Sequence, residues 1–256
     1  MREFTFLSIG AVYQEFLNQG YEIISFLEYL KNPNREKVLI LRHDVDRFPK
    51  QSLKMAQLES DMGITATYYF RIRKSTYKPD IINEIKSLGH EIGYHYENLT
   101  DCNGNYEKSL ADFEYNLNSL REYYPIETIC MHGSPMSKWD NKLLWSKYDY
   151  KKYGLIAATS FDIDYDKFFY ISDNGWGWNN TKVSVRDKVK TKFNIPIDNT
   201  QHLIDLVSKG ELPNYVMINA HPDTFFDDDL SWFLNKTLIK SKNVIKKQIV
   251  KYNILK

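Results

Sequence analysis

Short apolar runs alternate with helical patterns along this chain, and this alternation constrains the fold more than any other feature. The clearest helical pattern covers 106–124, where apolar residues recur every three or four positions before Pro125. The runs between helices are rich in β-branched and aromatic residues, which is typical of buried strands. The predicted strands are 37–41, 65–72, 90–95, 128–132, 168–171 and 215–220. Strands that alternate with helices predict a parallel sheet, and we expect one α/β domain over residues 1–256.

The two ends of the chain differ from its middle. Residues 12–30 are predicted as one or two helices broken at Gly20, so 1–36 is expected to be a helical extension. Residues 231–256 are predicted as a helix whose charges are all lysines. Such a basic amphipathic helix either packs on the domain with a solvated face or makes weak contact with an anionic membrane surface.

The charge balance and the cysteines limit the class of protein. Lys and Arg number 34 against 33 for Asp and Glu, whereas nucleic-acid binders usually carry a basic excess, so we expect no nucleic-acid partner. No run reaches the ~20 apolar residues of a membrane span. Cys102 and Cys130 are too few for a disulfide framework and fit a reducing compartment. Because the N-terminus also lacks a signal-peptide pattern, a cytoplasmic location is expected.

Ionisable residues stand at the ends of several predicted strands, just before a turn. In a barrel of parallel strands the C-terminal ends meet on one face, where catalytic groups collect. A purely structural use would distribute such residues over both ends. The pattern therefore predicts a site at the C-terminal ends of the strands, built from Asp44, Asp46, His95, Glu97, His132, Asp173 and His221.

Asp44 and Asp46 are two positions apart and share one side if the strand persists. One carboxylate could bind a metal while the other accepts a proton from water near that metal. The alternative is structural: Asp46 caps a turn, and Asp44 pairs with Arg42 or Arg47.

His95 and Glu97 form a second pair on one side of a strand end. A histidine and a carboxylate are suitable ligands for Zn²⁺ or a similar divalent ion. The alternative for His95 is a buried histidine satisfied by ordinary hydrogen bonds.

Two of these motifs together resemble a known family. HDVD at 43–46, followed by GHEIGYH at 89–95, resembles the NodB-homology polysaccharide deacetylases, the superfamily of the family 4 carbohydrate esterases. MHGSP at 131–135 and NAHP at 219–222 resemble its WbmS-like branch, which is found with surface-polysaccharide loci. The resemblance covers roughly 38–225 and implies an irregular (β/α) barrel with its site at the C-terminal ends of the strands.

The resemblance also implies roles for single residues. Asp44 takes the place of the catalytic base, Asp46 of a metal ligand, and His95 of the first histidine ligand. His221 takes the place of the general acid. The family's second metal histidine lies four residues after the first, and this chain has Leu99 there.

The third protein ligand must therefore come from elsewhere, and His132 and Glu97 are the candidates. We favour His132, which leaves Glu97 as a substrate-binding residue. Another role for His132 would be to orient Asp44, because the family usually has an arginine nearby.

Two indoles stand between glycines in the segment 173–178. Trp176 and Trp178 could stack on a sugar face, or their burial could hold the loop in place. In the family a late aspartate and a tryptophan line the pocket, so Asp173 and both tryptophans are predicted to bind substrate.

The resemblance implies a metal-dependent hydrolase that removes an N-acyl group, expected to be N-acetyl, from an amino sugar in surface-polysaccharide biosynthesis. One divalent transition metal, expected to be zinc, is the implied cofactor. The substrate is expected to be nucleotide- or lipid-linked. Two alternatives remain open: an inactive sugar-binding or assembly module, which the departure at Leu99 would favour, and a hydrolase of a small non-sugar amide.

Overall fold

The computed structural model of the chain describes residues 2–179 and 189–252. In that part of the chain, eight strands form one sheet in which all paired neighbours are parallel. The strand order is β6-β5-β4-β3-β2-β8-β7, and β1 pairs with the first half of β2. The strands are β1 (Glu22–Ile24), β2 (Val38–Val45), β3 (Thr67–Phe70), β4 (Glu91–Tyr96), β5 (Thr128–Met131), β6 (Ala157–Ala158), β7 (Phe169–Ser172) and β8 (Tyr215–Ala220).

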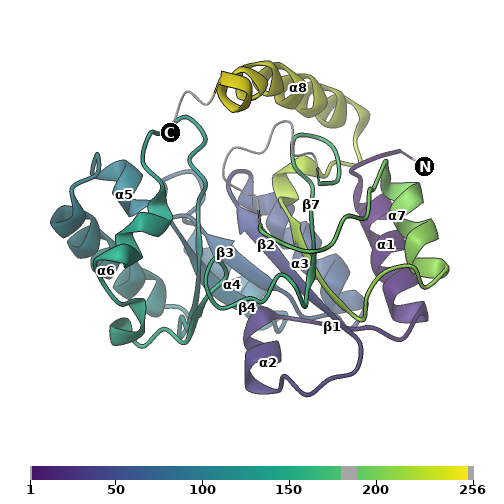
Figure 1. Cartoon of the computed structure of the whole chain (residues 1–256), viewed down its shortest axis with the longest axis horizontal. Helices are drawn as coiled ribbons and strands as arrows, with labels where there is room; N and C mark the ends of the chain where they lie inside the picture. The colour runs from purple at the N-terminus through teal and green to yellow at the C-terminus, as the bar shows by residue number, and fades with distance from the viewer. Residues whose placement is uncertain (1, 180–188, 253–256) are drawn as a thin grey trace.

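Helices surround the sheet, and the last of them crosses above it (Figure 1). The α-helices are α1 (Phe6–Asn18), α2 (Phe26–Lys31), α3 (Pro49–Asp61), α4 (Pro79–Ser87), α5 (Asn98–Asp101), α6 (Tyr106–Arg121), α7 (Thr200–Ser208) and α8 (Asp229–Tyr252). Short 3₁₀ helices lie at Asn141–Ser146, Tyr150–Tyr153 and Pro222–Thr224. Among the described residues, no helix combines the length and apolar character that crossing a bilayer requires.

The sheet curls into an incomplete barrel. Alternate residues of β2 face opposite ways: Leu39 joins the large apolar cluster that includes the helices, and Ile40 joins a smaller one. The smaller cluster includes Ala157 of β6 and Tyr170 of β7, the two end strands of the sheet. Shared packing between opposite ends of the strand order requires a curled sheet. The fold is therefore the predicted irregular (β/α) barrel.

All six predicted strands are present, and β2 runs beyond the predicted 37–41 as far as Val45, so Asp44 lies within the strand. Two strands were missed. β6 has two residues and β1 has three, which is too short for an alternating pattern to be visible.

The prediction of helix throughout 12–30 is wrong at β1. Ile23 and Ile24 are buried, and β1 pairs with Val38–Ile40 of β2. The first 36 residues therefore contribute a strand to the sheet as well as two helices. Residues 253–256, the end of the predicted basic helix, lie outside the described residues.

A buried carboxylate lies at the end of the sheet opposite the strand C-termini. Glu91, the first residue of β4, accepts hydrogen bonds from the backbone N–H of Leu27 (2.9 Å) and from the hydroxyl groups of Thr67 (2.5 Å) and Thr128. Burial raises the pKa of Glu91. These bonds join the start of α2 to β3, β4 and β5, and so close this end of the barrel.

Replacing Glu91 by alanine should lower the free energy of unfolding by about 3 kcal/mol, because three buried donors lose their acceptor. Urea denaturation followed by circular dichroism measures this change. Glu84→Ala, at an exposed position on α4, is the control and should change stability by less than about 0.5 kcal/mol. Equal stability of the two variants would contradict a structural role for Glu91.

Candidate active site

The ionisable residues at the strand ends meet, as the sequence predicts. Nε2 of His95 lies 3.5 Å from Oδ1 of Asp46, and Nε2 of His132 lies 3.6 Å from Oδ2 of the same carboxylate. Nε2 of His221 lies 3.8 Å from Oδ2 of Asp44. Four different strands, β2, β4, β5 and β8, bring these groups together at their C-terminal ends.

Asp46, His95 and His132 form a donor set suited to a metal ion. One ligand atom of each lies within 4.8 Å of the others. Ligands around a tetrahedral zinc with bonds of about 2.1 Å would be about 3.4 Å apart, close to the separations in this structure. Oδ1 of Asp46 is buried and has no hydrogen-bond partner among the described residues, so it keeps a free acceptor site. The residues therefore fit a divalent cation.

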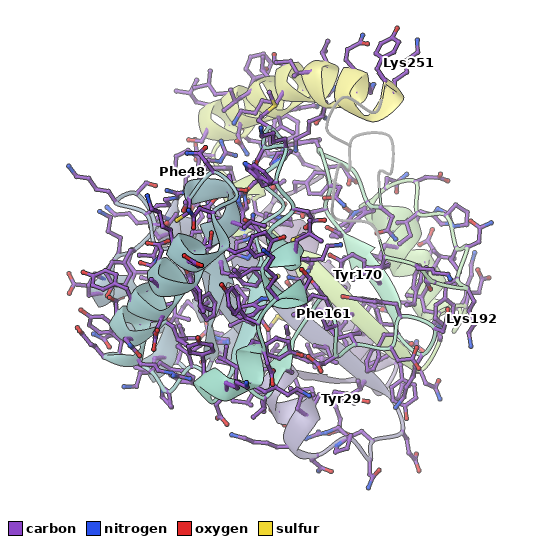
Figure 2. The ribbon with its side chains drawn as sticks, turned by 60° about the vertical axis from the view of Figure 1, so that its left-hand side comes forward. Tyr29, Phe48, Phe161, Tyr170, Lys192 and Lys251 are labelled. Carbon is purple, nitrogen blue, oxygen red and sulfur yellow. The ribbon has the colours of Figure 1, made fainter. Side chains whose placement is uncertain are left out.

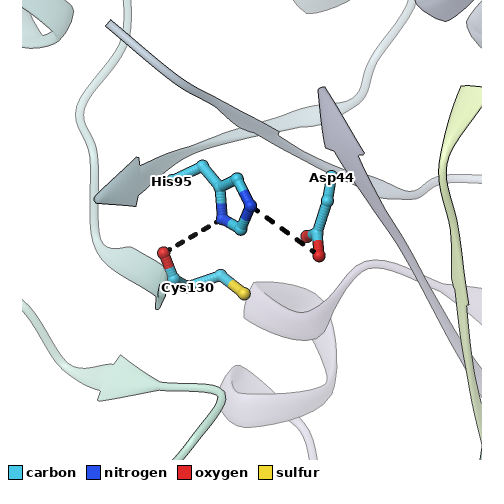
Figure 3. A group of neighbouring side chains, drawn as sticks. All are labelled: Asp44, His95 and Cys130. Carbon is cyan, nitrogen blue, oxygen red and sulfur yellow. Dashed lines mark hydrogen bonds and ion pairs between the residues drawn. The ribbon is translucent and has the colours of Figure 1, made fainter. Parts of the chain in front are cut away.

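Both histidines of this set are held in a fixed orientation. Nδ1–H of His95 donates to the carbonyl oxygen of Cys130 (3.1 Å), while Nε2 points toward Asp44 (Figure 3). The same Nε2 lies close to Asp46. Nδ1–H of His132 donates to the carboxylate of Glu97 (2.8 Å). A hydrogen bond at Nδ1 leaves the lone pair on Nε2, which is the usual arrangement of a metal-binding histidine.

Glu97 supports His132 and lies outside the donor set. Its carboxylate accepts two hydrogen bonds from Arg71 (2.7 and 2.8 Å) and one from Arg73 (2.7 Å). Burial would raise the pKa of Glu97, but the hydrogen bond from His132 and the arginines hold it well below its usual range. Of the two candidates for a third ligand, the structure thus places His132 in the donor set. The protein partners of Glu97 hold its carboxylate, although the residue also lines a cavity, so its role as a substrate-binding residue stays a prediction.

A second set of donor atoms, from Asp44, His95 and Cys130, shares His95 with the first. Nη1 of Arg42 contacts two of its members, Oδ1 of Asp44 (2.8 Å) and Sγ of Cys130 (3.0 Å). The set that contains Asp46 also has a guanidinium nearby, but Nη1 of Arg71 lies 3.9 Å from Oδ1 of Asp46 and makes no hydrogen bond to it. Because Arg42 contacts its set directly and repels a second cation more strongly, the set that contains Asp46 is the better metal site.

Asp44 is held as a carboxylate in the barrel interior. Arg42 donates to its Oδ1, and the side-chain amide of Asn219 donates to its Oδ2 (2.9 Å). Burial raises the pKa of Asp44, but the charges of Arg42, His95 and His221 outweigh burial and lower it below its ordinary value. The ion pair between Arg42 and Asp44 is thus the one that the structural alternative expected. The same ion pair lowers the pKa of Asp44 and keeps the carboxylate charged. Asn219 was missed, although it precedes His221 in the NAHP motif.

His221 is held as an imidazolium. Both oxygens of Asp173 face it, one accepting from Nδ1–H (2.5 Å) and the other from the backbone N–H (3.0 Å). Burial would lower the pKa of His221, but Asp173 raises it well above its ordinary value. Asp173 is buried and bound to His221, so it positions that histidine; it also borders the cavity beside His221, and its contact with substrate stays a prediction.

A cavity of about 260 Å³ opens over Asp46, His132 and His221, and Trp176 forms part of its wall. Helix α8 supplies another part of the wall, and no sequence pattern predicted this position for the helix. A second cavity of about 510 Å³ adjoins it, since both are lined by His132 and Pro135. Trp139 lines this second cavity, another aromatic residue that sequence reasoning missed.

Trp178 does not line either cavity. It is 4% exposed, packs against Phe4 with ring centroids 5.6 Å apart, and donates its indole N–H to Thr200 (3.1 Å). The prediction that Trp178 binds substrate is therefore wrong, because its rings are used to anchor the loop. Leu99, four residues after His95, is fully buried in α5 and faces the core.

Neither protein-family models nor curated protein sequences match this chain. Solved structures that resemble it in fold include a family 4 carbohydrate esterase from Streptomyces lividans in complex with acetate, with 13% identity over 82% of this chain and 90% of that one and a TM-score of 0.45. A family 4 carbohydrate esterase from Bacillus anthracis has 11% identity over 91% and 85% of the two chains and a TM-score of 0.43. The peptidoglycan deacetylase PdaC from Bacillus subtilis has 13% identity over 87% and 95%, with a TM-score of 0.42.

Asp46→Ala, His95→Ala and His132→Ala should each remove a divalent metal from the purified protein, because each deletes one donor atom. Metal content by mass spectrometry measures the loss. Cys130→Ser separates the two donor sets: it should keep the metal if Asp46 and His132 are ligands. His202→Ala, on the distant α7, is the matched histidine control. Loss of metal in Cys130→Ser but retention in His132→Ala would assign the ion to the other set.

Proposed function

We propose that this chain is a hydrolase that removes an N-acyl group, specifically N-acetyl, from an amino sugar, with zinc as its cofactor. One observation carries the proposal. A carboxylate and an imidazolium, Asp44 and His221, lie 3.8 Å apart beside a donor set suited to a metal, and His221 and Asp46 of these groups line one cavity. Hydrolysis of an amide needs a base for the attacking water and an acid for the leaving amine. The two residues supply both in the required protonation states.

Asp44 acts as the base. Water attacks the acyl carbon and gives its proton to the Asp44 carboxylate, which Arg42 and Asn219 hold in place. His221 acts as the acid: it gives its Nε2 proton to the amine nitrogen as the C–N bond breaks, leaving a carboxylic acid and a free amino sugar. Asp173 stabilises the charged histidine until that step.

The residues that would hold the metal are Asp46, His95 and His132. Two imidazole nitrogens and one carboxylate oxygen are a common catalytic zinc set, and they leave a position open for substrate. A divalent cation there would polarise the acyl carbonyl and make nearby water more acidic.

The sugar in this proposal rests on the resemblance of the HDVD and GHEIGYH motifs and on Trp176, whose indole borders the cavity. The same resemblance supports a role in surface-polysaccharide biosynthesis. A cytoplasmic reaction fits a chain with two cysteines, Cys102 and Cys130, which are too few for a disulfide framework. The paired protonation states favour an enzyme over an inactive binding module, since binding alone does not require them.

Asp44→Asn should lower kcat for release of acetate from an N-acetylated amino sugar by about 10²–10⁴-fold, because the base is lost. Metal content should stay at the wild-type level, which separates this effect from loss of the cofactor. Asp61→Asn, at an exposed position of α3, is the control and should keep full activity. Wild-type turnover by Asp44→Asn would contradict the assigned base.

Arg42→Gln should shift the acidic limb of the kcat/KM profile to higher pH. The base must be ionised, and removing the guanidinium raises the pKa of Asp44 toward and above its ordinary value. Activity of the variant is therefore lost at a higher pH than in the wild type as the pH falls. An unchanged acidic limb in a folded variant would show that Arg42 does not set the protonation of Asp44.

We further propose weak contact between α8 and an anionic membrane surface. Its outward side exposes Leu230, Phe233, Leu234, Leu238, Val244, Ile245 and Tyr252. The helix carries six lysines, and its only acidic residue is the first, Asp229. Figure 2 shows Lys251 on this helix, at the outer edge of the molecule. Exposed apolar side chains beside lysines are the pattern of an interfacial helix.

Leu234→Ser combined with Ile245→Ser should reduce binding to vesicles of anionic phospholipid, measured by co-sedimentation. Neutral phospholipid vesicles should bind weakly in every case, because the lysines then lack their counter-charge. Leu7→Ser combined with Leu143→Ser removes exposed leucines elsewhere and is the control. If the wild-type protein is a dimer and the α8 variant is a monomer, the exposed side of α8 instead serves self-association.

A further inference from the structure

The inward side of α8 places two lysines over the reacting groups. Lys242 and Lys246 line the same cavity as Asp46 and His221, together with Arg47 from the turn after β2. We propose that the substrate carries a phosphate group close to its acylated amine and that these three cations bind it. The inference rests on the proposed function and narrows its substrate to phosphorylated amino sugars.

The position of α8 is set by polar contacts. The Asn243 side-chain amide donates to the carbonyl oxygen of Gly175 (2.7 Å), and the Asn235 amide donates to that of Asp223 (2.9 Å). Both asparagines are buried, although most of the helix is exposed. Because Asn243 lies between Lys242 and Lys246, its anchoring holds both lysines at the cavity.

The two lysines lack the partners that other cations of the site have. Arg47 donates to Asp223 (2.6 Å), and Arg71 donates to Glu97. Within residues 2–179 and 189–252, neither Lys242 nor Lys246 forms an ion pair within 4.0 Å or a hydrogen bond through its side chain. Burial lowers the pKa of both lysines. Lys246 is partly buried, whereas Lys242 is exposed at the cavity rim, so a bound anion would mainly relieve the cost of the charge on Lys246.

Hydrolysis of a neutral amide gives these cations no role, since the base, the acid and the donor set are already present. Two lysines without an ion-pair partner, beside an arginine that Asp223 already pairs, match a doubly charged phosphate better than a single carboxylate, and lysine is a common phosphate ligand. The cavity of about 260 Å³ contains both the cations and His221, so the phosphate must be near the reacting amine. A sugar 1-phosphate, a nucleoside diphosphate sugar and a polyprenyl diphosphate sugar share this chemistry.

Binding tests the inference without catalysis. Calorimetric titration of the wild-type protein should give at least tenfold tighter binding for N-acetylglucosamine 1-phosphate than for N-acetylglucosamine. Lys242→Gln combined with Lys246→Gln should abolish that preference. The matched control replaces Lys50 and Lys54, two exposed lysines four residues apart on α3, by glutamine and should keep it. Equal affinity for the two sugars, or a preference unchanged in the double variant, would overturn the inference.

Kinetics separate this inference from the proposed function. The double variant should raise KM for the phosphorylated sugar at least tenfold with little change in kcat. Release of acetate from neutral and phosphorylated sugars at equal kcat/KM would leave the function standing and overturn the inference. Phosphate-selective binding without acetate release from any of the sugars would support the phosphate site and contradict the proposed function. Comparing nucleoside diphosphate and polyprenyl diphosphate sugars then identifies the source of the phosphate, since preferential turnover of either supports the inference.

Discussion

The ion pair between Arg42 and Asp44 is the interaction on which the site depends. Both residues lie on the inner side of β2 and are almost fully buried, where a charge without a partner would be unstable. The buried guanidinium of Arg42 is stabilised further because it donates hydrogen bonds to Cys130 and Tyr170, which come from strands on either side of the barrel. The curl of the sheet thus makes a charged carboxylate tolerable in the interior, and this carboxylate is the group best placed to accept a proton.

The histidines around this ion pair follow one rule: in each, Nδ1–H donates to an oxygen behind it, and Nε2 faces the aspartates. The oxygen is the carbonyl of Cys130 for His95 and a carboxylate for His132 and His221. Asp173 raises the pKa of His221 well above its ordinary value, and Asp46 and Glu97 raise that of His132 to about 9 despite its burial. The shared orientation brings each Nε2 to an aspartate: His95 and His132 lie beside Asp46, and His221 lies beside Asp44. The aspartate that each ring faces therefore separates the donor set from the proposed acid.

The sequence predicted the strand ends well because that pattern is local. Asp44, His95 and His221 each follow an apolar run, and parallel strands bring such ends together without further information. The residues that hold these histidines in place were harder to predict. Glu97 and Asp173 were expected to bind substrate, because no local sequence pattern indicates that Arg71 or a histidine pairs with them. Trp176 and Trp178 are two positions apart and both pack against Phe4, so only the hydrogen bond from Trp178 to Thr200 of α7 distinguishes the buried one.

Helix α8 shows why an amphipathic pattern does not determine which side packs inward. An apolar stripe usually faces the core, yet here Leu234 and Ile245 are exposed, while Asn235 and Asn243 are buried. The reason lies beneath the helix: the strand ends present carbonyl oxygens and charged groups, which an apolar face could not satisfy. The polar inner side of α8 thus follows from the polar groups that it covers. It also leaves Lys242 and Lys246 at the wall of the cavity that Asp46 and His221 line.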